Sequence, residues 1–212
     1  MKFYKSTRIY TEEGIVDGFL GVKDGKTNSI ITGMIDKLYE DFGDKRIIPG
    51  VIDTHNHGAI GYRFDECKTQ EEIKACLLGE AAYGVTGIFP TINQIDQFSI
   101  LADVADNEVI GAKILGIHSE GPWGARVGEK GDDKNTYYKP VNLDDAKRMF
   151  EDARGWLKLV AIAPEVDKAL DAIRYFKSVG VTTSAYHTNA NYEQANIGID
   201  NGISVATHLG NV

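Results

Sequence analysis

The sequence predicts an α/β fold built on a parallel sheet and preceded by a small β-rich segment. From about residue 50 onward, short β-rich runs alternate with amphipathic helical patterns, and all five histidines lie at the predicted carboxyl ends of those runs. Strands that alternate with helices in this way favour a parallel sheet, wound either open or as a barrel. The first 48 residues instead indicate short strands joined by turns that contain Gly and Asp.

Six β-rich runs are expected after this first segment: RIIPGVIDTHNHG, GVTGIFPTI, AKILGIHSEGP, LKLVAIAPE, GVTTSAYHTNA and GISVATHLG. The helices between them carry start and stop signals. TQEEIKACLLGEAAYG has Thr69 and Glu72 in capping-box spacing and ends at Gly84. DKALDAIRYFKSVG ends at Gly180, and NLDDAKRMFEDARG is a third amphipathic helix.

Composition favours a soluble globular protein with a sizeable core, because 42% of the 212 residues are hydrophobic and 25% are charged. A net charge of -8 argues against nucleic acid or an anionic membrane surface as a partner. No apolar run approaches the roughly 18 residues that a membrane helix needs. We expect a cytoplasmic protein in which Cys67 and Cys76 are reduced thiols.

The stretch DTHNH places Asp53, His55 and His57 on one face of a strand, because residues two apart point to the same side. Neutral imidazole nitrogens are good ligands for zinc, iron or nickel. Two interpretations of the pair stay open. It is either part of a divalent-metal site, or two imidazoles that hydrogen bonds satisfy at a strand end.

The stretch HSEGPW puts His118 and Glu120 on one face of another strand, with Glu120 at its top. Gly121 and Pro122 are expected to turn the chain sharply after it. A carboxylate among imidazoles is a suitable ligand for the same ion, although a carboxylate that caps the next loop is also common.

His187 in AYHTNA and His208 in ATHLGN complete the set, although either histidine alone would more often be a satisfied core residue. With Glu120 they offer one carboxylate and two imidazoles from three strands. This count fits a catalytic zinc-type site with an open position for water. Such an ion lowers the pKa of its water toward ~7 and polarises a carbonyl group, so the set predicts hydrolysis of an amide or ester.

Taken in order, PGVIDTHNHG, GVTGIFPT, GIHSEGPW, LVAIAPE, GVTTSAYHTNA and THLGN resemble N-acetylglucosamine-6-phosphate deacetylases of the amidohydrolase superfamily. The combination of HSEGP, HTNA and THLxN makes the resemblance specific. It implies that residues 49–212 form a TIM-type (β/α) barrel, incomplete with about six of eight strands. Residues 1–48 are then part of a small β-sandwich domain.

The resemblance implies metal ligands at five positions: Glu120, His187, His208, His55 and His57. The last two match a pair that holds a second ion in some members of the family. We expect His118 and Asp53 to lie next to these ligands and to orient them without binding the metal themselves. The expected cofactor is a divalent metal, Zn²⁺ first and Fe²⁺ or another ion as alternatives, with one or two ions held.

The implied reaction removes the acetyl group from an amino-sugar phosphate, converting N-acetylglucosamine-6-phosphate to glucosamine-6-phosphate and acetate. Asn211 matches a substrate-binding asparagine of the family. Two residues depart from the family pattern: Gly210 replaces a bulky aromatic residue, and Asp133 stands where a substrate-binding histidine is usual. A carboxylate at that place would repel a sugar phosphate, so an amidohydrolase acting on a different amide is the alternative.

The family's catalytic aspartate, a general acid and base, follows the eighth strand and is absent from these 212 residues. We therefore expect the chain alone to bind metal but to have little or no deacetylase activity. A fragment of a longer protein, a partner chain that supplies the missing part, and a truncated non-catalytic metal-binding protein are the alternatives. The resemblance also implies a homodimer.

Overall fold

The computed structural model describes residues 1–107, 109–125 and 139–210, so Asp133 and Asn211 lie outside the described residues. The chain divides into two compact units, residues 1–50 and residues 51–212. Each unit has its own sheet.

The first unit is a mixed sheet of five strands in which β1 is central. Its strands are β1 (Lys2–Thr11), β2 (Gly14–Lys23), β3 (Lys26–Ile31), β4 (Glu40–Asp41) and β5 (Arg46–Ile47). β2 pairs antiparallel with both β1 and β3, whereas the two-residue strands β4 and β5 pair parallel with β1. The predicted N-terminal β layer is therefore present, and its place in a sandwich stays a prediction.

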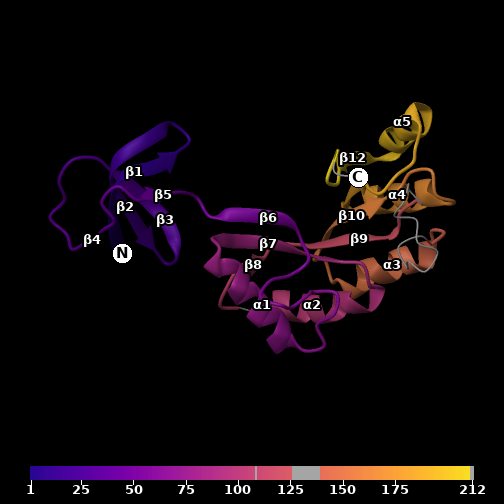
Figure 1. Cartoon of the computed structure of the whole chain (residues 1–212), viewed down its shortest axis with the longest axis horizontal. Coiled ribbons are helices and arrows are strands. Elements are labelled where there is room, and N and C mark those ends of the chain that lie inside the picture. The colour runs from indigo at the N-terminus through magenta and orange to yellow at the C-terminus, as the bar shows by residue number, and fades with distance from the viewer. Residues whose placement is uncertain (108, 126–138, 211–212) are drawn as a thin grey trace. The chain divides into compact units, whose positions relative to one another are not determined.

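The second unit contains a curled parallel sheet in the order β12-β11-β10-β9-β7-β6, with β8 paired to β7 (Figure 1). Its strands are β6 (Val51–Asn56), β7 (Val85–Ile92), β8 (Lys113–Ile114), β9 (Ile117–Trp123), β10 (Leu157–Ile162), β11 (Thr182–Ala185) and β12 (Ile203–Ala206). Every described strand pair in it is parallel, which confirms the predicted sheet. Within the described residues β6 and β12 are its edges, so closure into an eight-stranded barrel stays a prediction.

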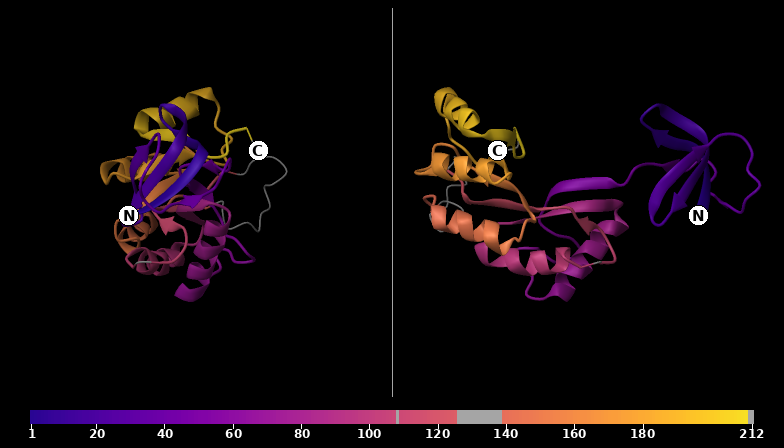
Figure 2. Two further views of the ribbon diagram at one scale, coloured as in Figure 1. Left: turned by 90° about the vertical axis from the view of Figure 1, so that its left-hand side faces the viewer. Right: turned by 180° about the vertical axis from the view of Figure 1, so that it is seen from behind.

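The helices of this unit follow the strands and line one side of the curled sheet (Figure 2). They are α1 (Gln70–Ala82), the short 3-10 helix η1 (Ile95–Gln97), α2 (Phe98–Ala105), α3 (Leu143–Asp152), α4 (Ala169–Ser178) and α5 (Tyr192–Asn201). The predicted capping box is confirmed, because the Glu72 amide donates to the Thr69 hydroxyl and the Glu72 carboxylate accepts from the Thr69 amide. Among the described residues, no helix combines the length and apolar character that crossing a bilayer requires.

The core lies between the sheet and these helices. β9 is buried at all seven of its positions, as strands covered on both faces of a parallel sheet are. The largest fully buried side chains around it include Trp123, Phe98, Phe176 and Met149. Glu120 is thus carried by a strand that is buried along its whole length.

The position of His118 corrects one prediction. The expected run AKILGIHSEGP is divided into β8 and β9, so His118 is the second residue of β9 and does not lie at its carboxyl end. Nor do Gly121 and Pro122 end the strand. Glu120 pairs with Ala161 and Trp123 with Ile162, so the two intervening residues form a bulge and pairing resumes after it.

Candidate metal centre

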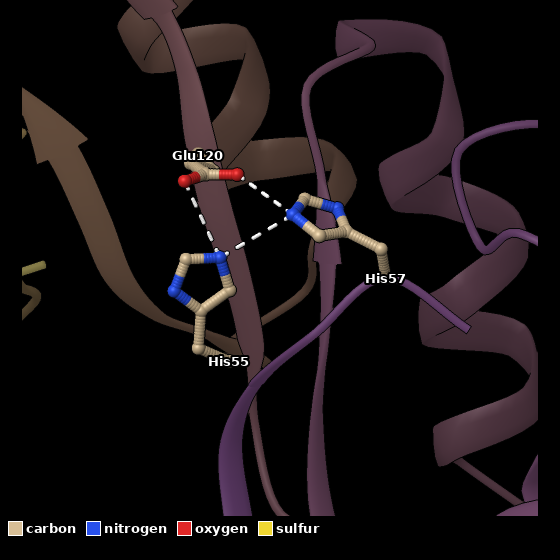
Figure 3. A group of neighbouring side chains, drawn as sticks. All are labelled: His55, His57 and Glu120. Carbon is tan, nitrogen blue, oxygen red and sulfur yellow. Dashed lines mark hydrogen bonds and ion pairs between the residues drawn. The ribbon is translucent and has the colours of Figure 1, made fainter. Parts of the chain in front are cut away.

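Three imidazoles converge on the buried carboxylate of Glu120. The Nε2 atom of His57 lies 2.8 Å from Oε2, and the Nε2 atoms of His55 and His208 lie 3.3 and 3.0 Å from Oε1. Figure 3 shows the rings of His55, in β6, and His57, just after β6, both pointing at the carboxylate of Glu120. The ring centroid of His187 lies 4.8 Å from that of His208.

These side chains form two candidate metal-binding groups that share Glu120. The first contains His55 and His57, the second contains His187 and His208, and in each group the donor atoms lie within 4.8 Å of one another. Nitrogen and oxygen ligands lie about 2.0–2.2 Å from a Zn²⁺ ion, so donors on one ion are themselves about 3–4 Å apart. The donor atoms of the first group lie 2.8–3.3 Å apart and fit one divalent cation in spacing and type. The second group has suitable donor types, and its His208 nitrogen lies 3.0 Å from the carboxylate. The five predicted ligands are brought together as a cluster, and their role as ligands stays a proposal.

Glu120 is held in its ionised form. Burial raises the pKa of its carboxyl group, but hydrogen bonds from His55 and His57 outweigh burial and lower the pKa below its usual range. The same burial acts on His118 in the opposite sense. Desolvation, helped by the nearby His55 ring, lowers the pKa of His118 to about 3, so this imidazole is neutral at physiological pH.

The two histidines of the second group have an unusual backbone conformation. His187 and His208 each follow the end of a strand, β11 and β12, and both have φ of +34°. Non-glycine residues in the left-handed region are uncommon and are typical of functional sites. Behind them, the hydroxyl groups of Ser184 and Thr207 lie 2.6 Å apart, and the Thr207 amide donates to the carbonyl of Ala185 at 2.9 Å.

The carboxylate of Asp53 does not join the first group but contacts the backbone and side chain next to it, and its predicted supporting role stays a proposal. One oxygen accepts from the His55 amide at 3.1 Å, and the other accepts from the Asn56 side chain at 2.9 Å. The Asn56 side-chain oxygen in turn accepts from the amide of Gly58 at 2.8 Å. Asp53 therefore shapes the backbone that presents both histidines.

A buried threonine in β7 contacts residues of the two neighbouring strands, β6 and β9. The Oγ1 atom of Thr91 in β7 accepts from the Asn56 amide at 2.9 Å and lies 3.3 Å from Nδ1 of His118. The His118 ring meets that of His55 edge-on, with centroids 4.8 Å apart. Sequence reasoning missed Thr91, a single polar residue in the apolar run GIFPTI, and Asn56, which stands between His55 and His57 and points to no chemistry of its own.

Of the predicted substrate-binding residues, only Gly210 is among those described. With His187 and His208 it lines a cavity of about 220 Å³. Its φ is +79°, and a Cβ atom there would meet no atom within 4 Å. The backbone conformation thus explains a glycine at this place, and its predicted contact with substrate stays a proposal.

A curled parallel α/β sheet on which histidines and a glutamate gather points to a class: α/β proteins with side chains that could hold a metal ion. No family model matches the chain. A search of characterised proteins finds N-acetylglucosamine-6-phosphate deacetylase of Bacillus subtilis, 28% identical over 220 residues. The alignment covers 98% of this chain and 55% of the relative, so the chain spans about half the length of the curated relatives it matches.

Solved structures agree. N-acetyl-D-glucosamine-6-phosphate deacetylase of Mycobacterium smegmatis superposes with a TM-score of 0.88 at 27% identity, covering 99% of this chain and 61% of that one. A mutant of that enzyme in complex with N-acetyl-D-glucosamine-6-phosphate gives 0.87 at 28% identity, covering 99% and 56%. The resemblance predicted from the motifs is confirmed: over nearly its whole length, the chain is similar to part of the N-acetylglucosamine-6-phosphate deacetylases.

Proposed function

We propose that this chain supplies the metal centre of a hydrolase that removes the acetyl group from N-acetylglucosamine-6-phosphate, releasing glucosamine-6-phosphate and acetate. The observation that carries the proposal is the shared carboxylate of Glu120, within reach of two pairs of histidines. The similarity to deacetylases of that name supports the substrate.

His55 and His57 with Glu120 would hold one divalent ion, and His187 and His208 with the same carboxylate would hold another. Nitrogen and oxygen donors of this kind suit Zn²⁺ first and Fe²⁺ as an alternative. A metal bound there would polarise the amide carbonyl and lower the pKa of an attacking water.

The chain's own residues would prepare the site for that reaction. Glu120 stays ionised through its contacts with His55 and His57, so it balances cationic charge without first losing a proton. The neutral His118 packs behind the first group and adds no positive charge that would repel an ion. Gly210 would border the sugar, with Asn211 as a further substrate contact.

Further proposals concern the turnover of the isolated chain, its location and oligomeric state, and the alternative substrate. The 212 residues alone are expected to show little turnover, because the proton-transferring aspartate of the family is not among them. A cytoplasmic location and a homodimer are proposed from composition and resemblance. Asp133 leaves a different amide substrate as the alternative function, since a carboxylate disfavours a phosphate nearby.

Metal content and ligand binding test the proposal. The purified chain is reconstituted with Zn²⁺ or Fe²⁺, dialysed and analysed for metal, beside Glu120→Gln and, as a control for charge, Glu71→Gln on the exposed face of α1. The unsubstituted chain and the control should retain metal, and Glu120→Gln should lose it. A chain that retains no divalent ion under any reconstitution would refute the metal centre.

Substrate class is tested with the metal-loaded chain and with the full-length product of its gene. N-acetylglucosamine-6-phosphate should bind more tightly than the unphosphorylated sugar, and the full-length product should release acetate from it. Turnover of neither sugar by the full-length product would favour the alternative amide substrate.

A further inference from the structure

We propose that Glu165 is a positioning residue of the metal centre, whose carboxylate fixes the backbone that follows His187 and thereby the direction of that imidazole. The proposal rests on the proposed metal function. It concerns a residue that is not itself a ligand in either of the two groups.

The carboxylate of Glu165 joins the ends of two neighbouring strands. Glu165 follows β10, and residues 188–189 follow β11, which pairs with β10 in the sheet. The Thr188 hydroxyl donates to one carboxylate oxygen at 2.7 Å, and the Asn189 amide donates to the other. Both oxygens therefore hold the segment directly after His187.

The Thr188 hydroxyl has its proton committed to this contact. Its oxygen accepts from the Ala190 amide at 3.0 Å, and its single O–H donates to the Glu165 carboxylate, so the hydroxyl joins Glu165 to the backbone at Ala190. A glutamine in place of Glu165 keeps the shape but offers one acceptor oxygen instead of two, so it can preserve only part of the arrangement.

His187 needs such support because its φ is +34°. A non-glycine residue in this region is strained and persists where its surroundings over-determine it. The His187 carbonyl accepts from the Ala125 amide at 2.8 Å. The two residues that follow are also bound to Glu165, so the chain directly after the strained residue is held by two independent sets of contacts.

Loss of the Glu165 contacts should affect only one of the two metal-binding groups, which distinguishes a positioning role from a general loss of stability. His187 belongs to the second group only, together with His208 and Glu120. His208 has the same φ but is tied through Thr207 to Ser184, independently of Glu165. Loosening the Glu165 contacts should therefore weaken binding at the second group while the first group, with His55 and His57, is unaffected.

The test titrates Co²⁺ into the chain and follows its visible absorption, with bound metal counted after dialysis. Glu165→Ala should weaken one of the two binding steps by about 10–100-fold, the range for partners that orient a ligand, and Glu165→Gln should lie between Glu165→Ala and the unsubstituted chain. Asp167→Ala, an exposed neighbour, is the control and should change neither step. Equal weakening of both steps, or none in Glu165→Ala, would overturn the proposal.

A second readout needs no metal. In the metal-free chain, amide hydrogen exchange at Asn189 should be faster in Glu165→Ala, because its acceptor is removed, whereas exchange in the core strand β9 should be unchanged and show that the fold persists. Unchanged exchange at Asn189 would refute the role of Glu165 even if metal binds. Failure of the unsubstituted chain to bind any metal, with exchange altered as expected, would instead refute the proposed function and leave Glu165 as a purely structural clamp.

Discussion

The Oε1 atom of Glu120 lies 3.0 Å from the Nε2 atom of His208, although 88 positions separate the two residues. In the sheet their strands, β9 and β12, are separated by β10 and β11. Three strand spacings amount to about 14 Å along a flat sheet. The contact therefore depends on the curl of the sheet, which brings Glu120 of β9 and the residues after β12 toward each other.

Single-ligand variants should separate the two groups. His57→Ala should remove binding at the first group and leave the second, and His187→Ala should do the reverse, because the two groups share only Glu120. Glu120→Gln should weaken both by more than the roughly 10–100-fold typical of supporting residues. Metal per chain after dialysis is the measurement. Two ions retained in Glu120→Gln would contradict the shared carboxylate.

Asp53→Ala should weaken binding at the first group by about 10–100-fold without removing a ligand. The reason is that Asp53 accepts from the His55 amide and from the Asn56 side chain, and so shapes the backbone that presents the first group. Competition with a metal chelator measures the affinity. Asp17→Ala, an exposed carboxylate in the first unit, controls for the change in net charge. An affinity equal to that of the control would show that Asp53 has no such role.

The ligand cluster was predictable from the sequence because four of the five histidines lie at or just after the carboxyl ends of β6, β11 and β12, which is a distinctive pattern. The residues that hold the ligands were not predictable. Thr91 supports Asn56 from 35 positions away, and Glu165 reaches Thr188 from 23 positions away. Threonine, asparagine and glutamate are ordinary residues near strand ends, and only the folded sheet shows what they contact.

The error over His118 has a different cause. Alternation along a strand predicts which residues share a face, but it does not predict where a strand starts or whether it bulges. The extra residues Gly121 and Pro122 are absorbed within β9, so the strand continues to Trp123 and His118 lies near its beginning.

Two adjacent leucines of α1 test the packing between helix and sheet. Leu77 is fully buried, whereas Leu78 is 54% exposed. Leu77→Ala should lower the free energy of unfolding by about 2–5 kcal/mol through lost burial and the cavity left behind. Leu78→Ala, the matched control, should change it by no more than ~0.5 kcal/mol. Urea unfolding followed by circular dichroism measures both, and similar losses in the two variants would contradict the orientation of α1.

The buried thiol of Cys76 makes stability depend on alkaline pH. Its sulfur accepts from the Ala59 amide at 3.1 Å, and burial raises the pKa of the thiol from 9.0 to about 11. Because the folded state keeps the proton more tightly, the thiol contributes its full stability below pH 9. That contribution is lost as the pH rises through the folded-state value, since the unfolded thiol ionises first.

The free energy of unfolding of the unsubstituted chain should therefore fall relative to that of Cys76→Ala between about pH 9 and pH 11. Lysines, tyrosines and Cys67 are present in both proteins, so their titration cancels in the difference. Urea unfolding at a series of pH values measures it. A difference that stays constant from pH 8 to pH 11 would show that the Cys76 thiol has the same pKa in both states. Thiol labelling of the folded chain at pH 8 should likewise be slow at Cys76, because the side chain is buried and predominantly protonated.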